Sequence, residues 1–253
     1  MRASSAVTVF FALAMGVTIP ADRPTTVVVE LFTSEGCSSC PPADVLLRQL
    51  VDAQPVKGAR IVALGEHVDY WDQQGWKDRF SSAALTNRQQ TYAQALNVDS
   101  IYTPQMIVNG QAQLVGSDAA SARRAIEQAV SAPHGDMQIA IAPHGDRISV
   151  TMTASGLPQA SHGDHSAFVL AVTEDGLTSD VRRGENRGRT LSHTAVVRLL
   201  KTMGDAGGGA VAGEVAIDPS WQRDRVKIVA FVQESRSRRI VAAGEVPLSG
   251  ASR

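Results

Sequence analysis

Cysteine is scarce in this sequence, with only two among 253 residues. Two thiols exclude a mini-domain held by several disulfides and any metal site with four thiolate ligands. Neither sign of charge dominates, because 24 Lys and Arg face 25 Asp and Glu and leave a formal net charge of −1. A nearly neutral chain argues against a protein whose main task is to bind nucleic acid. We therefore expect no nucleic-acid partner.

Long hydrophobic runs are missing beyond the N-terminus. The apolar run at residues 6–17 follows Arg2 and precedes the small residue Ala21. It is shorter than the roughly 20 residues that a transmembrane helix needs, and its flanks are typical of a secretory signal peptide. We predict that residues 1–21 are a signal peptide and that the mature protein has no membrane span. We expect it to be exported, either periplasmic or secreted, into an oxidising compartment.

Nucleotide and hydrolase motifs are also absent. The sequence contains no phosphate-binding loop, no dinucleotide glycine pattern and no Gly-x-Ser-x-Gly elbow. We therefore expect no cofactor. Hydrophobic residues make up 43% of the chain and charged residues 19%, which is enough apolar material for a core and excludes wholesale disorder.

The two cysteines stand three residues apart, at the start of an expected helix. Residues 26–32 are β-branched and almost continuously apolar, which is typical of a strand buried on both faces. A turn then leads to Cys37 and Cys40, and two prolines follow that suit a first helical turn. In Cys-x-x-Cys motifs at helix N-termini the thiol pKa falls from about 8.5 to roughly 3.5–7.5. We expect Cys37 to be the exposed, attacking sulfur and Cys40 to be the resolving one.

The rest of the chain divides into two parts by its hydrophobic pattern. Up to residue 131 the order is β-α-β-α-β-β-α, and the Asn-Gly pair at 109–110 predicts the hairpin. Beyond it, short strands at hairpin spacing predict a β-sandwich-like part. The expected elements after the first helix are strand 60–65, helix 81–96, strands 105–108 and 111–115, helix 119–130, strands 137–141, 147–152 and 167–173, helix 194–203, and strands 211–217, 226–232 and 240–246.

This arrangement resembles the thioredoxin fold: a buried strand runs into a Cys-x-x-Cys at a helix start, and an x-Pro later precedes a hairpin strand. The resemblance implies that Pro104, preceded by Thr103, has a cis peptide bond and lies against the dithiol, where both residues orient the substrate backbone. It also implies that Glu30 matches in position the buried acid that relays a proton beneath the thioredoxin dithiol.

Longer segments resemble a single family, the exported bacterial proteins of domain-of-unknown-function family 1223 (DUF1223). The segments are 30–44, 67–72, 75–78, 102–105 and 184–190. We interpret the chain as an α/β thioredoxin-like domain followed by a mostly-β, sandwich-like domain. The boundaries that we assign are residues 25–132 for the first domain and 137–248 for the second.

Further candidate residues follow the second strand, where α/β proteins place their ligands. His67 could accept a proton from the dithiol or bind copper with it, or loop carboxylates such as Asp69 could hold it by hydrogen bonds. Trp71 either covers the dithiol as a substrate platform or packs between loop and helix. Four arginines in residues 182–189 either bind carboxylate or phosphate, or pair in a solvated loop with Asp180 and Glu185.

The sequence favours an exported thiol–disulfide oxidoreductase-like protein that acts on a protein or small-molecule thiol or disulfide. Two alternatives stay open at this point. One is a redox-inert binding or structural protein with a purely structural Cys37–Cys40 disulfide. The other is a copper-handling protein in which Cys37, Cys40 and His67 are the metal ligands.

Overall fold

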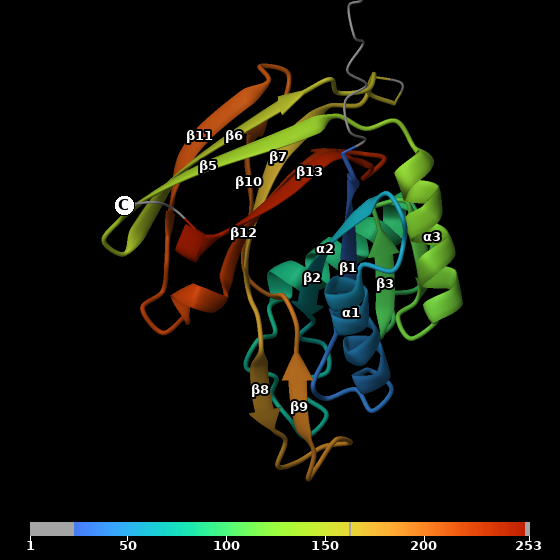
Figure 1. Cartoon of the computed structure of the whole chain (residues 1–253). Coiled ribbons are helices and arrows are strands. Elements are labelled where there is room, and N and C mark those ends of the chain that lie inside the picture. Colours follow the sequence, from blue (N-terminus) through green and yellow to red (C-terminus); the bar gives the residue numbers. More distant parts are fainter. Residues whose placement is uncertain (1–22, 162, 251–253) are drawn as a thin grey trace, which may run out of the picture.

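The computed structural model describes residues 23–161 and 163–250 (Figure 1). The expected signal peptide, residues 1–21, lies outside the described residues. Within the described part of the chain, no helix is long and apolar enough to cross a membrane. Three α-helices, two short 3₁₀ helices, one large sheet and two smaller sheets form the described fold.

The large sheet is mixed and takes strands from both predicted parts of the chain. Strand β2 pairs in parallel with β1 and with β10, and the remaining pairs are antiparallel. The predicted boundary near residue 132 therefore does not separate two sheets. In spatial order the strands are β13 (Ile240–Pro247), β12 (Val226–Glu234), β7 (Ser166–Glu174), β10 (Val196–Asp205), β2 (Ala59–His67), β1 (Thr25–Thr33), β3 (Gln105–Val108) and β4 (Ala112–Val115).

A three-stranded antiparallel sheet packs on the C-terminal half of the large one. Alternate residues of its middle strand, such as Ile148 and Val150, are buried against Phe168 of β7 and Ile228 of β12. This period-two burial is what the sequence pattern predicts for a half-buried strand. The two sheets share one hydrophobic core, and the larger of them also contains β1 and β2. The three strands are β11 (Ala210–Ala216), β6 (Arg147–Ser155) and β5 (Asp136–His144).

The helices cover both faces of the N-terminal half of the large sheet. On β1, Val27 and Val29 pack into one core with two helices, whereas Val28 packs on the opposite face with Leu85. Because side chains alternate across a strand, Glu30 lies on the same face as Val28. The helices on the Val27 face are α1 (Pro41–Ala53) and α3 (Ala119–Ser131), and the helix on the Val28 face is α2 (Ala83–Ala95).

The predicted helix at 194–203 is wrong, because this segment is strand β10 in the middle of the large sheet. Two register shifts against β7, after Val197 and after Thr202, interrupt the alternation of side chains along β10. Such bulges hide the period-two pattern of a strand, and pairing on both sides overrides the helix propensity of leucine, lysine and methionine. The 3₁₀ helices are η1 (Arg223–Arg225) and η2 (Leu248–Gly250).

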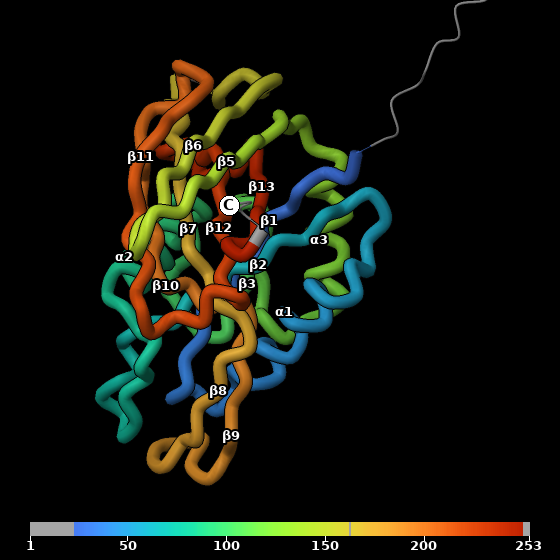
Figure 2. The backbone as a smooth tube through the Cα atoms, turned by 60° about the vertical axis from the view of Figure 1, so that its left-hand side comes forward, coloured from blue at the N-terminus to red at the C-terminus, as the bar shows by residue number. Residues whose placement is uncertain are grey.

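A two-stranded hairpin of β8 (Leu177–Asp180) and β9 (Thr190–His193) is separate from both sheets, and the sequence analysis missed it. It projects beyond the end of the large sheet, at the bottom of Figures 1 and 2. Strand β9 lies beside α1. The hairpin therefore reaches the end of the molecule at which α1 begins.

The predicted Asn109-Gly110 hairpin between β3 and β4 is confirmed. Both residues have positive φ, 45° and 69°, as a tight two-residue turn requires. A Cβ at Gly110 would lie 1.9 Å from the carbonyl oxygen of Arg238. Only glycine fits this position, because the backbone of a neighbouring loop approaches so closely.

Candidate functional site

Cys37 and Cys40 form a disulfide at the N-terminus of α1, with their Cα atoms 5.4 Å apart. After β1 the backbone turns tightly: the N–H of Cys37 donates to the carbonyl of Ser34, and the N–H of Cys40 donates to that of Cys37. Cys40 is the N-cap residue of α1, and its carbonyl accepts from the N–H groups of Ala43 and Asp44. The two intervening residues thus place both sulfurs where the helix begins.

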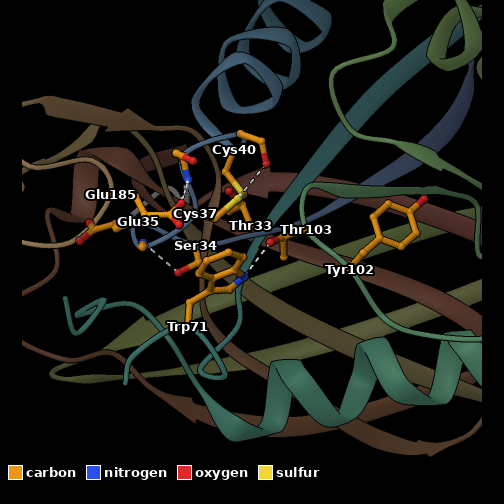
Figure 3. The surroundings of a disulfide bond; sticks show 12 residues. Thr33, Ser34, Glu35, Cys37, Cys40, Trp71, Tyr102, Thr103 and Glu185 are labelled. Carbon is orange, nitrogen blue, oxygen red and sulfur yellow. Dashed lines mark hydrogen bonds between the residues drawn. A yellow bond between two sulfur atoms is a disulfide. The ribbon is translucent and has the colours of Figure 1, made fainter. Parts of the chain in front are cut away.

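The loop before β3 forms one side of this site (Figure 3). The Thr103–Pro104 peptide bond is cis, as the resemblance to thioredoxin implies. A Cβ at Gly116 would lie 3.0 Å from Cβ of Pro104 and 3.1 Å from Cβ of Ala43, so Pro104 lies beside the first turn of α1. The indole N–H of Trp71 donates to Oγ1 of Thr103 (2.8 Å). Three of the residues selected from the sequence are therefore gathered next to the disulfide.

The loop between β8 and β9, residues 181–189, binds the backbone of the cysteine turn on the other side of the disulfide; we call it the hairpin tip. The side-chain amide of Asn186 donates to the carbonyls of Glu35 and Cys37, both at 2.9 Å. Glu185 accepts from the backbone N–H of Ser38 (3.0 Å). In Figure 3, Glu185 lies on the side of the disulfide opposite to Thr103.

Both sulfur-bearing residues are closed off from solvent, since Cys37 and Cys40 are each 0% exposed. The expectation of an exposed Cys37 is therefore wrong. One contact that local sequence cannot show adds to this burial: Asn186, 149 residues further along the chain, binds the backbone carbonyl of Cys37 and is itself buried. The exposed part of the motif consists of the two serines between the cysteines.

Five buried ionisable residues lie next to the cysteine turn: Glu35, Asp44, His67, Asp78 and His193, which we call the buried cluster. His67 Nδ1 lies 2.6 Å from Asp78 Oδ2, and the same oxygen accepts from the backbone N–H of Glu35 (2.9 Å). His193 Nε2 lies 3.2 Å from Glu35 Oε1, without the alignment of a hydrogen bond. The rings of His67 and His193 stack edge to face, with centroids 4.7 Å apart.

Asp44 is the carboxyl group of the buried cluster that titrates near neutral pH. Burial raises the pKa of Asp44 to about 7; the positive charge of His193 opposes the rise, and the negative charges of Asp78 and Glu35 add to it. Burial also raises the pKa of Asp78, but its contact with His67 outweighs that effect and holds the pKa below its ordinary value. Residues four apart on a helix share a face, so Asp44 lies one turn beyond Cys40 on the same side of α1.

This assignment predicts how Asp44→Asn changes stability with pH. In the wild type, the free energy of unfolding falls between about pH 4 and pH 7, because the folded state keeps a proton on Asp44 that the unfolded state releases. Asparagine can still accept the Thr33 hydroxyl bond that Asp44 Oδ1 accepts, but it does not titrate. In urea unfolding, the free energy of unfolding of Asp44→Asn should therefore rise relative to that of the wild type, by up to about 4 kcal/mol between about pH 4 and pH 7.

The control for this experiment is Asp52→Asn, at an exposed position of the same helix. Its unfolding free energy should differ from that of the wild type by the same small amount at every pH. A pH-independent difference for Asp44→Asn would show that Asp44 keeps an ordinary pKa.

Two other residues selected from the sequence, Glu30 and Asp69, form hydrogen bonds that stabilise the fold and are not part of the disulfide site. Glu30 accepts hydrogen bonds from Arg88 Nε (2.6 Å) and from the Tyr92 hydroxyl, on the α2 face of the sheet. It does not lie beneath the dithiol, because α1 begins on the opposite face. Asp69 accepts from the Thr86 hydroxyl (2.6 Å) and so ties the β2 loop to the start of α2.

The proposed copper ligands do not come together. His67 contacts Asp78 and the rings of Phe80 and His193. Among residues 23–161 and 163–250, no group of three or more His, Cys, Asp or Glu side chains is placed to hold a metal ion. While Cys37 and Cys40 are joined in a disulfide, these two residues and His67 do not form the metal site of the copper-handling alternative.

Asp44, Asn186 and His193 are the residues that sequence reasoning missed. Asp44 could have been found, because a carboxyl four residues after Cys40 must share its helix face. Asn186 stands in a segment that resembles DUF1223, yet nothing local places it on the cysteine turn. His193 carries no sequence signal, since it reaches the site through a hairpin that was not predicted.

Most of the chain is similar to known structures. The crystal structure of a protein from Agrobacterium tumefaciens is 27% identical and has a TM-score of 0.69, covering 92% of this chain and 99% of that one. HBP35 of Porphyromonas gingivalis is 15% identical, with a TM-score of 0.64 over 90% of this chain and 77% of that one, and so has a similar fold. No curated protein matches the chain. The family model described as "Protein of unknown function (DUF1223)" matches residues 28–233, so the chain belongs to the DUF1223 family.

Proposed function

We propose that the protein is an exported thiol–disulfide oxidoreductase-like protein that reacts through Cys37 and Cys40. The observation that carries this proposal is the position of the disulfide, at a helix N-terminus and next to the cis Thr103–Pro104 peptide. The positive end of the helix dipole favours the thiolate that exchange chemistry needs. Asp44 supplies a carboxyl group one turn away that can take up or release a proton near neutral pH.

The exchange step balances without a cofactor. A substrate thiolate attacks Sγ of Cys37, the bond between Cys37 and Cys40 breaks, and Cys40 leaves as a thiolate. A second substrate thiolate then attacks the substrate sulfur of the mixed disulfide, and Cys37 leaves. The substrate dithiol loses two electrons and two protons, and the cysteine pair gains them. In the reverse direction Cys37 attacks a substrate disulfide and Cys40 resolves the mixed disulfide.

Because both sulfurs are buried, we propose that the hairpin tip moves away before a substrate reacts. The contacts that must break are few, and the two hydrogen bonds of Asn186 are the buried ones. Hydrogen bonds contribute about 0.5–1.5 kcal/mol each to stability, so local opening of the tip costs far less than unfolding the chain. Trp71 and the Thr103–Pro104 loop then border the uncovered site.

We further propose that residues 25–132 act as a thioredoxin-like unit and that residues 137–248, the sandwich-like unit, supply its cover. The hairpin tip belongs to the second unit and the cysteines to the first. An oxidised Cys37–Cys40 pair suits the periplasm or the cell exterior, where disulfides persist. The substrate that we propose is a protein or small-molecule thiol or disulfide.

The reduction potential of the Cys37–Cys40 pair tests the proposal. The protein is equilibrated with dithiothreitol and glutathione redox buffers, and the reduced fraction is counted by mass after thiol alkylation. We expect a potential above about −300 mV, in the range of pairs that exchange. The oxidised protein should also oxidise an equimolar reduced dithiol peptide.

One observation favours a second function, a redox-inert protein with a structural bridge: neither cysteine is exposed. Structural disulfides have potentials below about −300 mV and resist reduction by glutathione. A value in that range, together with no reaction with the dithiol peptide, would establish the structural bridge and reject the oxidoreductase.

A further inference from the structure

The hairpin tip carries an excess of positive charge. Residues 182–189 contain four arginines and one glutamate. The expectation that these arginines pair with Asp180 and Glu185 is wrong: Asp180 accepts from the Thr190 hydroxyl, and Glu185 accepts from a backbone N–H of the cysteine turn. Neither acid forms an ion pair with these arginines, but both keep their negative charge, so residues 180–190 carry four positive and two negative charges.

None of the four arginines forms an ion pair within the part of the chain that the structure describes. Arg182, Arg183 and Arg187 are exposed and have no side-chain partner there, and the side-chain hydrogen bond of Arg189 goes to the amide oxygen of Asn186 (3.1 Å). By comparison, the exposed Arg123 pairs with a glutamate one turn along α3. The tip therefore leaves several guanidinium groups available to a partner.

The loop on which the tip rests adds to this charge. A Cβ at Gly184 would lie 3.2 Å from Cβ of Trp76, so the tip packs on the loop that follows Trp71. Lys77 and Arg79 of that loop are exposed and unpaired with any described carboxylate, although Arg79 donates to a carbonyl of β8 (2.6 Å). A cationic surface thus extends from the tip along the edge of the site.

The tip is also held in a defined shape. Its backbone forms closing hydrogen bonds from Val181 to Arg189 (2.9 Å) and from Gly188 to Val181 (2.8 Å), and a further one from Arg187 to Gly184. A loop whose backbone is already ordered loses little backbone freedom when a ligand binds, which favours recognition. Guanidinium groups suit carboxylates in particular, because their donors match the two carboxylate oxygens.

We infer that the hairpin tip, with Lys77 and Arg79, is a docking surface for an acidic peptide segment of a partner protein. The segment is rich in Asp and Glu, and its carboxylates pair with Arg182, Arg183 and Arg187. Because Arg187 directly follows Asn186, which binds the Cys37 carbonyl, a segment docked here stands next to the disulfide. The inference deepens the proposed function, on which it rests for the claim that this segment flanks the reacting thiols.

Equilibrium binding tests the docking surface without any redox step. A fluorescein-labelled, cysteine-free peptide of alternating Asp, Glu and Gly is titrated with the oxidised full chain, and anisotropy is recorded at low and moderate salt. R182Q/R183Q removes two exposed ion pairs with the peptide and should weaken binding by about two- to thirtyfold. The matched control R123Q/R124Q on α3 removes the same charge far from the tip and should bind as the wild type does. Binding should also weaken as salt screens the charges.

Three results would overturn the inference. They are no measurable binding of the acidic peptide, equal binding to the R182Q/R183Q and R123Q/R124Q variants, and equally tight binding of a single-stranded oligonucleotide of the same charge, which would mark a general polyanion surface.

The rate of thiol–disulfide exchange distinguishes a failure of the docking surface from a failure of the proposed oxidoreductase function. Reduced dithiol peptides with acidic, neutral or basic flanks are mixed with the oxidised protein at low salt. We expect the acidic peptide to react about ten times faster than the basic one, because opposite charge steers association. Reaction of all three at one rate would reject the docking surface alone. Binding of the acidic peptide with no reaction of any dithiol would reject the oxidoreductase alone.

Discussion

Arg88→Met is expected to destabilise the protein by about 3–5 kcal/mol, because it removes the only positive charge bonded to two buried carboxylates within the described chain. Arg88 Nε lies 2.6 Å from Glu30 and 3.3 Å from Glu66. Its other nitrogens donate to Gln233 of β12 (3.2 Å) and to the Tyr92 hydroxyl (3.0 Å). This network joins α2 to strands from both halves of the large sheet.

The loss should grow as the pH rises. Burial raises the pKa of Glu30, and only the charge and hydrogen bond of Arg88, with further hydrogen bonds, hold it below its ordinary value. Without Arg88 the folded state keeps a proton on Glu30 that the unfolded state releases above about pH 4, so stability is lost with rising pH. Glu66, whose pKa burial already raises, adds to the effect.

Urea unfolding of Arg88→Met and Arg123→Met at pH 5 and pH 8 measures this difference. Arg123 forms an exposed pair with Glu127 one helical turn away, so its replacement should cost less than about 0.5 kcal/mol at either pH. A loss below about 1 kcal/mol for Arg88→Met, or one equal to that of Arg123→Met, would contradict the role assigned to the network.

The sequence predicted the parts of the fold that depend on local chemistry. The apolar run of β1, the helix start after Cys40 and the Asn109-Gly110 turn all follow from a few adjacent residues, and the structure contains them. Strand β10 was misassigned, because its bulges against β7 erase the alternation by which a strand is recognised. The shared sheet depends on long-range pairing of β2 with β10, which has no local sequence signal.

The candidate site likewise combines features that local sequence predicts and features that depend on long-range contacts. Cys37 and Cys40 were selected because their spacing at a helix start indicates their geometry, and Pro104 was selected from the resemblance to the thioredoxin fold. The contacts that close the site come from the hairpin tip, which lies far along the chain and carries no pattern of its own. Exposure of Cys37 was therefore predicted wrongly, although its position at the helix start was right.

Asn186→Ala should speed the reduction of the disulfide by a bulky thiol such as glutathione. The two hydrogen bonds of Asn186 to the cysteine turn are lost, at about 0.5–1.5 kcal/mol each, so the open population of the tip should rise about 5- to 150-fold. When opening and closing are fast relative to the reaction, the rate follows that population. Asn87→Ala, at an exposed position of α2, is the matched control and should react at the wild-type rate.

The rate of this reduction tests the account most directly, because it depends both on a reactive Cys37–Cys40 pair and on the cover that closes it. Wild type, Asn186→Ala and Asn87→Ala are mixed with excess glutathione, quenched with an alkylating reagent at intervals and analysed by mass. We predict slow reduction of the wild type and of Asn87→Ala, and a rate at least about five times higher for Asn186→Ala. Equal rates for all three proteins would contradict the proposal that the hairpin tip controls access to the disulfide.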